Sequence, residues 1–349
     1  MNTDYPQFLD AVVSYALKAA QGPTSVPSNI HPQFAEEVDH LIHIVKLAQK
    51  NRYVVPWDMR TYYAAVQGQN GTNAVREAIL RRQFIPIHES LSNPSVIEDT
   101  TGSIVGYYLP DAILEGAIKQ SMPILGPTFR ENWGGTSRGT GGTGGTGGTG
   151  GSWRDAARLF LPADQSKAFG RGNVSASPAW QMQGHSGFED SIHVAANYGP
   201  GPGLKANRPT SGQLAFQQFM RNQLETGCLM SVALALTHPE QYALTRAGLE
   251  KLYEFEHICD RVSEWAFAFN VLTIVANRES TWHRDRLSGG LEWFDALLSI
   301  GGDDNTVLEL PGVGIRMQYT SGTMALYSGH THVHGVSSFT FTLPGLPHM

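Results

Sequence analysis

The spacing of apolar residues along the chain predicts helices through much of its length and strands toward its end. Several segments carry apolar side chains every three to four positions, which is the repeat of an amphipathic helix. The expected helices are residues 8–20, 32–50, 73–83, 212–235 and 246–261. Residues 84–87 and 103–109 have the composition of extended segments, and strands dominate from Trp265 onward.

The last strands set the expected fold class. Residues 269–276 are apolar and β-branched, as in a buried strand. Residues 314–319 and 324–328 flank the turn Thr320–Thr323, and we expect them to form a hairpin. Helices followed by such strands predict an α+β fold, with a double-stranded β-helix (jelly-roll or cupin-like) core in the C-terminal part, flanked by α-helices.

A low-complexity stretch divides the chain. Residues 134–152 repeat a Gly-Gly-Thr triplet without a single apolar residue, so they cannot bury a core. We expect a flexible linker there, either a natural expansion or an engineered segment. The predicted parts are therefore a helical N-terminal part of the catalytic domain (1–133), the linker (134–152), and the β-helix core with supporting helices (153–349).

Composition restricts the cellular setting. The chain has 349 residues, two isolated cysteines and no disulfide framework, which fits a reducing compartment. No apolar run reaches the length of a membrane span, and the N-terminal residues lack the basic and apolar regions of a signal peptide. We therefore expect an intracellular protein, nuclear or cytoplasmic, that does not enter a membrane.

The charge distribution bears on nucleic-acid binding. A formal net charge of −6 counts against broad electrostatic attraction to DNA. Between Lys119 and Arg171, however, seven basic residues stand against three acidic ones, a local surplus of 7 − 3 = 4. This surplus is either a flank that contacts phosphates or a solvated loop region of uneven charge.

The residues most informative about chemistry are His283, Asp285 and His334. In a β-strand, positions i and i+2 point to the same face, so His283 and Asp285 can bind one ion together. His334 lies on a later strand-like run and can complete a facial triad. Two imidazoles and one carboxylate with open coordination positions are the ligand set of non-haem Fe(II) oxygenases. The alternative is a surface histidine beside a solvated aspartate.

Two more histidines precede the distal ligand. In a regular strand, His330 and His332 would face the same side as His334, which leaves His332 as an alternative ligand. A zinc site built from these three histidines is also conceivable, although structural zinc usually recruits cysteines.

The order of these motifs resembles a known family. Residues 277–285, 308–314, 321–324 and 327–336 together resemble the fungal TET/JBP-like dioxygenases, and the likeness extends over about residues 255–336. Those are Fe(II)- and 2-oxoglutarate-dependent enzymes that oxidise methylated bases in DNA. The resemblance implies Fe(II) as cofactor and 2-oxoglutarate as co-substrate. It favours His334 as the distal ligand, because Gly335 and Val336 follow it as in the family's H-G-V motif.

The sequence departs from the family at the anchor for 2-oxoglutarate. Many of these enzymes hold the distal carboxylate with an Arg or Lys on the strand after the distal histidine, whereas residues 337–343 contain neither. Arg316 is the first candidate, because an alternating pattern places it opposite Ile315 and Met317. Arg278 is the second, and Asn277 or His330 could contact the base or the co-substrate. Arg316 could equally be the polar face of an exposed strand.

The resemblance implies oxidation of a methyl group on a modified nucleobase, 5-methylcytosine or N6-methyladenine, in DNA whose target base is flipped out. Trp282 and Tyr327 are candidate walls for that base or ordinary core residues. Two alternatives remain open. The same chemistry could act on a small molecule or a protein side chain, which the acidic composition favours. The chain could also be an inactive metal-binding homologue, which the missing anchor favours. The sequence indicates no oligomeric state.

Overall fold

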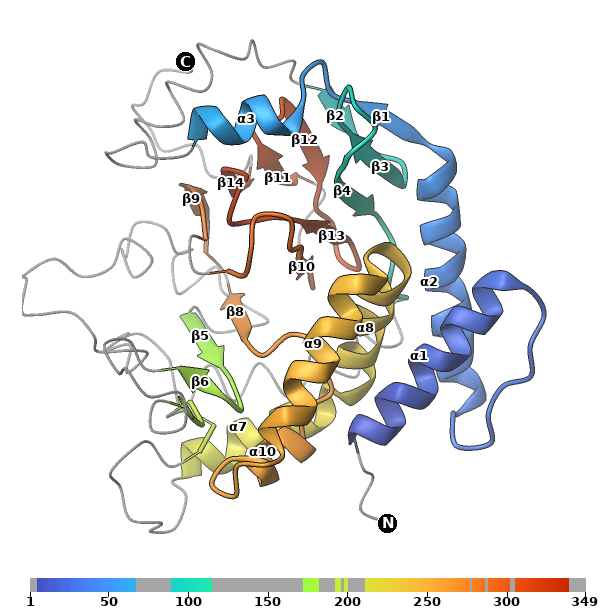
Figure 1. Cartoon of the computed structure of the whole chain (residues 1–349), viewed down its shortest axis with the longest axis vertical. Helices are drawn as coiled ribbons and strands as arrows, with labels where there is room; N and C mark the ends of the chain where they lie inside the picture. The colour runs from blue at the N-terminus through green and yellow to red at the C-terminus, as the bar shows by residue number, and fades with distance from the viewer. Residues whose placement is uncertain are drawn as a thin grey trace, which may run out of the picture. The chain divides into compact units, whose positions relative to one another are not determined.

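The computed structural model describes residues 5–66, 89–114, 172–181, 192–195, 198–199, 211–276, 278–285, 288–301 and 305–338. The predicted elements at 73–83 and 84–87, the Gly/Thr linker 134–152 and the basic stretch 119–171 lie outside these residues. The chain folds as two compact units (Figure 1). The helical unit is formed by residues 1–39 and 116–278, and the two-sheet unit by residues 40–115 and 279–349.

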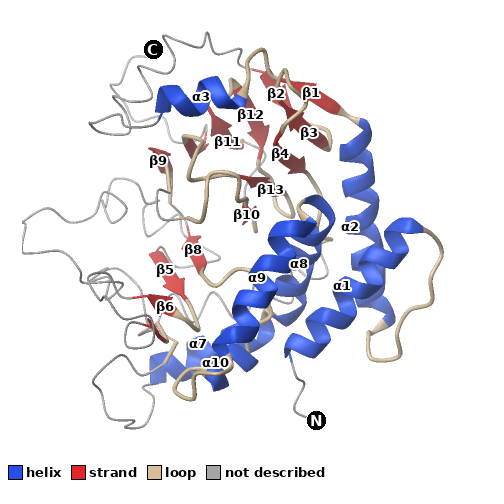
Figure 2. Cartoon of the chain, in the orientation of Figure 1, coloured by secondary structure: helices blue, strands red, loops and turns tan. Residues whose placement is uncertain are grey.

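The helical unit consists mainly of α-helices (Figure 2). Its helices are α1 (Tyr5–Gln21), α7 (Ser211–Asn222), α8 (Leu224–Thr237), α9 (Pro239–Leu252) and α10 (Cys259–Ser263). Helix α2 (Pro32–Lys50) begins in this unit and continues into the other. Two short antiparallel pairs complete it: β5 (Gly172–Ala176) with β8 (Leu272–Ala276), and β6 (Trp180–Gln181) with β7 (Ile192–His193).

Helix α8 lies at the centre of the helical unit. Small and apolar residues occupy every face of this helix, and 11 of its 14 residues are buried. At Gly227 the backbone of α8 packs directly against the backbone of Ala266, since an added Cβ would lie 2.9 Å from the Ala266 carbonyl oxygen. Ser231 accepts a hydrogen bond from the amide of Ala268 at 2.8 Å, which satisfies a buried backbone donor.

The structure confirms the helices predicted at 8–20 and 32–50, and it corrects two others. The segment 212–235 is broken at Gln223 into α7 and α8. The helix predicted from Arg246 to Arg261 is wrong at both ends. Helix α9 begins at Pro239, where proline suits the first turn and the His238 side chain accepts a hydrogen bond from the amide of Gln241. It ends at Leu252, and α10 is a separate short helix.

An ion pair between a buried arginine and an exposed aspartate joins α1 to α9 and gives the first prediction. The guanidinium of Arg246, of which 8% is exposed, donates to Asp10 Oδ1 at 2.9 and 3.2 Å. We expect Asp10→Ala to lower the free energy of unfolding by about 1–3 kcal/mol, because it leaves a buried cation without its partner. Glu254→Ala is the matched control, since it removes the exposed Lys251–Glu254 pair and should change nothing measurable. Urea unfolding followed by circular dichroism measures both, and equal midpoints would contradict the prediction.

The two-sheet unit contains two five-stranded sheets. The first sheet has the order β1 (Arg52–Val54), β3 (Ser95–Glu98), β4 (Ile104–Leu109), β13 (Met324–Tyr327), β10 (Asp295–Leu298). The second sheet has the order β2 (Glu89–Leu91), β12 (Ile315–Gln318), β11 (Thr306–Leu310), β14 (His334–Ser338), β9 (Ser280–His283). Each sheet therefore combines strands that precede residue 110 with strands that follow residue 279.

One apolar core lies between the two sheets. Leu308 and Met317 of the second sheet pack in the same buried cluster as Tyr108 and Ala325 of the first. We call the face of each sheet that carries this cluster its inner face. The outer face of the second sheet is covered near β9 and β14 by a smaller aromatic cluster, which includes Tyr62 of α3 (Met59–Val66; Figure 1).

The predicted hairpin at 314–328 is wrong, although both of its strands exist. β12 pairs with β11 and β2 in the second sheet, whereas β13 pairs with β4 and β10 in the first. The turn between them, which includes Gly322 at φ +85°, carries the chain from one sheet to the other. The amide of Gly322 donates to the carbonyl oxygen of Ser299, and the carbonyl oxygen of Thr323 accepts from the amide of Ser299, so the turn is held by Ser299 just after β10. Both sheets thus gain a strand from this crossing.

The α+β class is confirmed, as is the extended segment at 103–109, which is β4. The strand expected at 269–276 is present as β8, although its residues alternate between half-buried and exposed. Among the helices that the structure describes, none combines the length and apolar character needed to cross a membrane.

Candidate metal centre

Strands β9 and β14 bring the two histidines of the predicted triad together. They run antiparallel at one edge of the second sheet, and His283 is the direct partner of His334. The register then shifts by one residue before Val336 pairs with Ser280. The imidazole centroids are 4.3 Å apart, and both side chains are buried on the inner face.

Asp285 completes the cluster just beyond the end of β9. Its Oδ1 lies 3.7 Å from Nε2 of His283, and its Oδ2 lies 3.5 Å from Nε2 of His334. The three ligand atoms all lie within 4.8 Å of one another. The aspartate side chain is 41% exposed, whereas those of the histidines are 9% and 7% exposed. The carboxylate therefore marks the side of the cluster that is open to solvent.

Backbone carbonyls fix the orientation of both imidazoles. Nδ1 of His283 lies 2.7 Å from the carbonyl oxygen of Thr281, and Nδ1 of His334 lies 3.1 Å from that of His332. A carbonyl oxygen can only accept, so each Nδ1 carries a proton, and Nε2 of each ring is the nitrogen that faces Asp285 and is available to a metal. Such a bond on the non-ligating nitrogen is the usual support of a metal-binding histidine.

These residues fit a divalent metal ion. Bonds from such an ion to imidazole nitrogen or carboxylate oxygen are about 2.0–2.2 Å long, so ligands that share it lie within about 4 Å of each other. The separations of 3.5 and 3.7 Å between the carboxylate and the two imidazoles meet that condition, and the three ligand atoms together lie within 4.8 Å of one another. Two imidazoles and one carboxylate leave coordination positions free and contain no thiolate, which suits iron more than a closed structural zinc site.

The comparisons with known proteins add little to this picture. No protein-family model matches the chain, and no curated protein does. Among solved structures, the chain is similar to NgTET1 in complex with 5mC DNA, with 9% sequence identity and a TM-score of 0.42. That match covers 96% of this chain and 86% of the other.

The remaining histidines of the run do not join the cluster. His330 and His332 lie in the turn before β14, not on the strand itself, so the three histidines do not share one face as predicted. His332 is 1% exposed, and its ring lies 5.2 Å from that of Tyr62. Burial lowers the pKa of His332 to about 3 and keeps it neutral. Within the described chain, the group that could hold a metal contains neither of them.

Two side chains that face the cluster come from the first sheet, the buried Tyr327 and the half-buried Asp295. The ring of Tyr327 on β13 is 5.3 Å from that of His334, and its hydroxyl has no hydrogen-bond partner among the described atoms. Burial raises the pKa of Tyr327 well above its usual value. Burial likewise raises the pKa of the Asp295 carboxyl on β10 to about 6. The sequence makes Tyr327 a candidate to pack against a flipped base, whereas no motif in the sequence indicates Asp295.

The outer face of the second sheet carries a row of contacts behind the histidines. Trp282 donates from its indole nitrogen to Glu309 Oε2 at 3.0 Å, and its ring lies across Gly335. Glu309 Oε1 in turn accepts from Arg316 at 2.7 and 3.0 Å. Because Trp282 alternates with His283 along β9, this row lies on the face opposite the triad.

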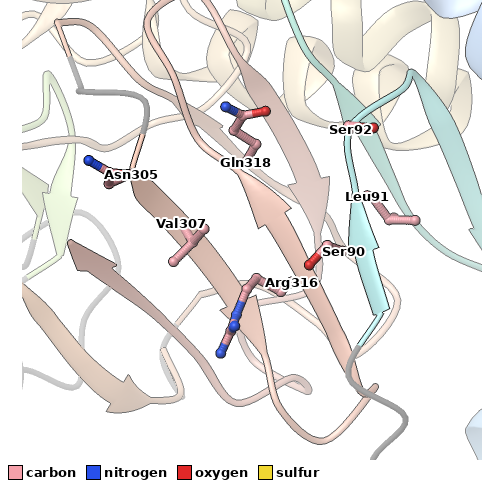
Figure 3. Close-up of a pocket in the computed structure, with 7 residues that line it drawn as sticks. All are labelled: Ser90, Leu91, Ser92, Asn305, Val307, Arg316 and Gln318. Carbon is pink, nitrogen blue, oxygen red and sulfur yellow. The ribbon is translucent and has the colours of Figure 1, made fainter. Parts of the chain in front are cut away.

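The structure places Arg316, the first predicted anchor, on the face of the second sheet opposite the triad. Arg316 is on the outer face, where it lines a hollow of about 370 Å³ (Figure 3). The other residues that line it are Ser90, Leu91, Ser92, Asn305, Val307 and Gln318. Arg278 is the last residue of the helical unit, and Asn277 lies outside the described residues. A role for these three residues at the site therefore stays a prediction.

Proposed function

We propose that this chain is an Fe(II)- and 2-oxoglutarate-dependent dioxygenase that oxidises a methyl group on a modified base in DNA, 5-methylcytosine or N6-methyladenine. The observation that carries the proposal is the cluster of His283, Asp285 and His334, with both Nε2 atoms turned toward one carboxylate. The proposal includes a double-stranded β-helix built from the two sheets, and an intracellular location, nuclear or cytoplasmic.

The residues of the site have separable tasks in this function. The two imidazoles and the carboxylate would hold Fe(II), which in such a facial site activates dioxygen at the expense of 2-oxoglutarate. The buried apolar cluster of the inner face lies beside the histidines and keeps water away from that side of the ion. The exposed side of Asp285 is where a co-substrate and a substrate would reach the ion.

The anchor for the co-substrate is a separate part of the proposal. Arg316 lies on β12, on the outer face, so to act as the anchor it would have to leave Glu309 and reach past β11 to the inner face near β14. The side chain of Arg316 in that ion pair is 34% exposed. Arg278 and Asn277 are the alternatives from the sequence. The ion pair that holds Arg316 on Glu309 favours a second candidate function, an inactive homologue that binds the metal but does not turn over 2-oxoglutarate.

DNA as the partner rests on the resemblance of residues 277–336 to the TET/JBP-like enzymes. A methylated base inside a duplex is out of reach of a buried ion, so it would be flipped into the site. The net charge of −6 gives no general attraction to phosphates, and binding would depend on a local basic surface.

Turnover of 2-oxoglutarate tests the proposal directly. Purified protein with Fe(II), ascorbate and 2-oxoglutarate should produce succinate faster when methylated oligonucleotides are added, and the double variant His283→Ala/Asp285→Ala should produce none.

The variant Arg316→Ala tests which residue anchors 2-oxoglutarate. A raised KM for 2-oxoglutarate assigns the role to Arg316, and an unchanged KM leaves it with the other candidates. Turnover independent of DNA would move the substrate to a small molecule or protein. Absence of turnover in iron-loaded protein would establish the inactive homologue.

A further inference from the structure

A closed circuit of hydrogen bonds holds the backbone of the exposed metal ligand. The amide of Asp285 donates to the carbonyl oxygen of Gly329 at 2.8 Å, and the amide of Gly329 donates to Asp295 Oδ2 at 2.9 Å. The other carboxylate oxygen, Oδ1, accepts from the hydroxyl of Ser288. The amide of Ser288 donates back to the carbonyl oxygen of Asp285 at 2.9 Å. Both backbone groups of Asp285 are thus tied to the half-buried carboxylate of Asp295.

This support differs from that of the histidine ligands. His283 and His334 lie within paired strands and have their rings fixed by carbonyl oxygens. Asp285 lies beyond the end of β9, and its amide bonds to the turn at Gly329. Its position therefore depends on the turn at Gly329 and, through that turn, on β10.

The carboxylate of Asp295 lies directly against Gly329, in the space that a side chain at that position would occupy. A Cβ at position 329 would lie 2.5 Å from Asp295 Oδ2 and 3.3 Å from Cε1 of His334. A side chain there is therefore incompatible with the present place of the carboxylate. The absence of a side chain lets Asp295 approach the turn between two metal ligands.

We infer that Asp295 is a positioning residue for the metal centre, which acts through the Gly329 peptide to set the place of Asp285. The inference rests on the proposed metal site, but it requires neither DNA nor 2-oxoglutarate. Among the described residues, Asp295 is not part of the group whose ligand atoms lie close enough to share an ion, and its two oxygens accept from Ser288 and Gly329.

Cobalt(II) binding by the full-length protein tests this role, because the visible absorption of cobalt reports its ligands. We expect Asp295→Ala to weaken cobalt binding by about 10- to 100-fold, the usual effect of losing an outer support of a metal ligand, and to change the spectrum. Asp295→Asn keeps an acceptor for the Gly329 amide and should bind cobalt near the wild-type affinity. Ser288→Ala cuts the circuit at its other end but leaves the Gly329 contact intact, so it should weaken cobalt binding less than Asp295→Ala does.

A double substitution guards against simple loss of folding. Gly329→Ala alone should weaken cobalt binding because its methyl group displaces the carboxylate. In Gly329→Ala/Asp295→Ala the methyl has room, so the double variant should be no weaker than either single variant. Wild-type affinity and spectrum in Asp295→Ala would overturn the inference and leave the metal site standing. A wild-type protein that binds no cobalt would instead overturn the metal site, and the inference with it.

Discussion

His283→Ala should weaken binding of cobalt(II) or iron(II) by more than about 100-fold, since loss of even an outer support costs 10- to 100-fold. The imidazole supplies one of only three protein ligands, and the residual His–Asp pair cannot enclose an ion. Asp285→Ala and His334→Ala should behave alike. Isothermal titration with metal-free protein measures the loss.

A nearby histidine provides the control for this result. His330 precedes the distal ligand by four residues and lies outside the metal-binding group. His330→Asn should therefore bind metal as the wild type does. If the two substitutions weaken binding equally, the metal is held elsewhere and the triad assignment is wrong.

Gly335→Ala should destabilise the protein by about 1–3 kcal/mol, the usual cost of forcing a methyl group into filled space. Its Cβ would lie 2.7 Å from the carbonyl oxygen of Ser280 and 2.8 Å from Cδ1 of Trp282. The first of these atoms is backbone of β9, so β9 must move away from β14. Because that strand pair sets His283 opposite His334, metal affinity should fall with stability.

Gly248→Ala is the matched control for the substitution at Gly335. Gly248 is an exposed residue of α9, and a Cβ there meets no atom within 4 Å. Alanine should stabilise this helix by up to about 1 kcal/mol. Thermal unfolding and cobalt titration of both variants decide the matter: a Gly335→Ala protein with wild-type stability and affinity would show that β9 and β14 do not form the pair described.

The triad could be predicted from sequence because each part of it has a local signature. An H-x-D at the end of an apolar strand places two ligands on one side, and the later His334 is followed by a glycine. The structure gives that glycine a physical reason that spacing alone does not show, since the indole of Trp282 occupies the place of its side chain. The selection of His334 over His332 also agrees with the metal-binding cluster.

Strand pairing could not be predicted in the same way. Residues 315–318 and 324–327 read as a hairpin because both are strands and the turn between them is short. Which strand pairs with which depends on partners distant in sequence, here β2 and β11 for one and β4 and β10 for the other. The helix end at Leu252 escaped prediction for a related reason, since apolar residues continue past it into an irregular turn.

Asp295 escaped prediction because a lone aspartate in the strand Asp-Ala-Leu-Leu has no motif around it. Its importance arises only when β10 and the turn at Gly329 meet. Arg316 shows the converse: alternation correctly set it opposite Ile315 and Met317, but that same alternation turned it toward Glu309 on the outer face.

The division of both sheets between distant segments has a consequence for synthesis on the ribosome. Strand β4 ends at Leu109 and β12, the partner of β2, begins at Ile315, so 205 residues (110–314) are translated between them. At about 5–20 residues per second, β2 and β4 wait at least about 10–40 s before their later partners emerge. Throughout that interval the edges of β2 and β4 that later receive β12 and β13 are unpaired, and unpaired edges are the sites at which chains join one another. The nascent chain is thus exposed to aggregation until residues 280–349 are made, and those same residues include His283, Asp285 and His334, which could hold the metal.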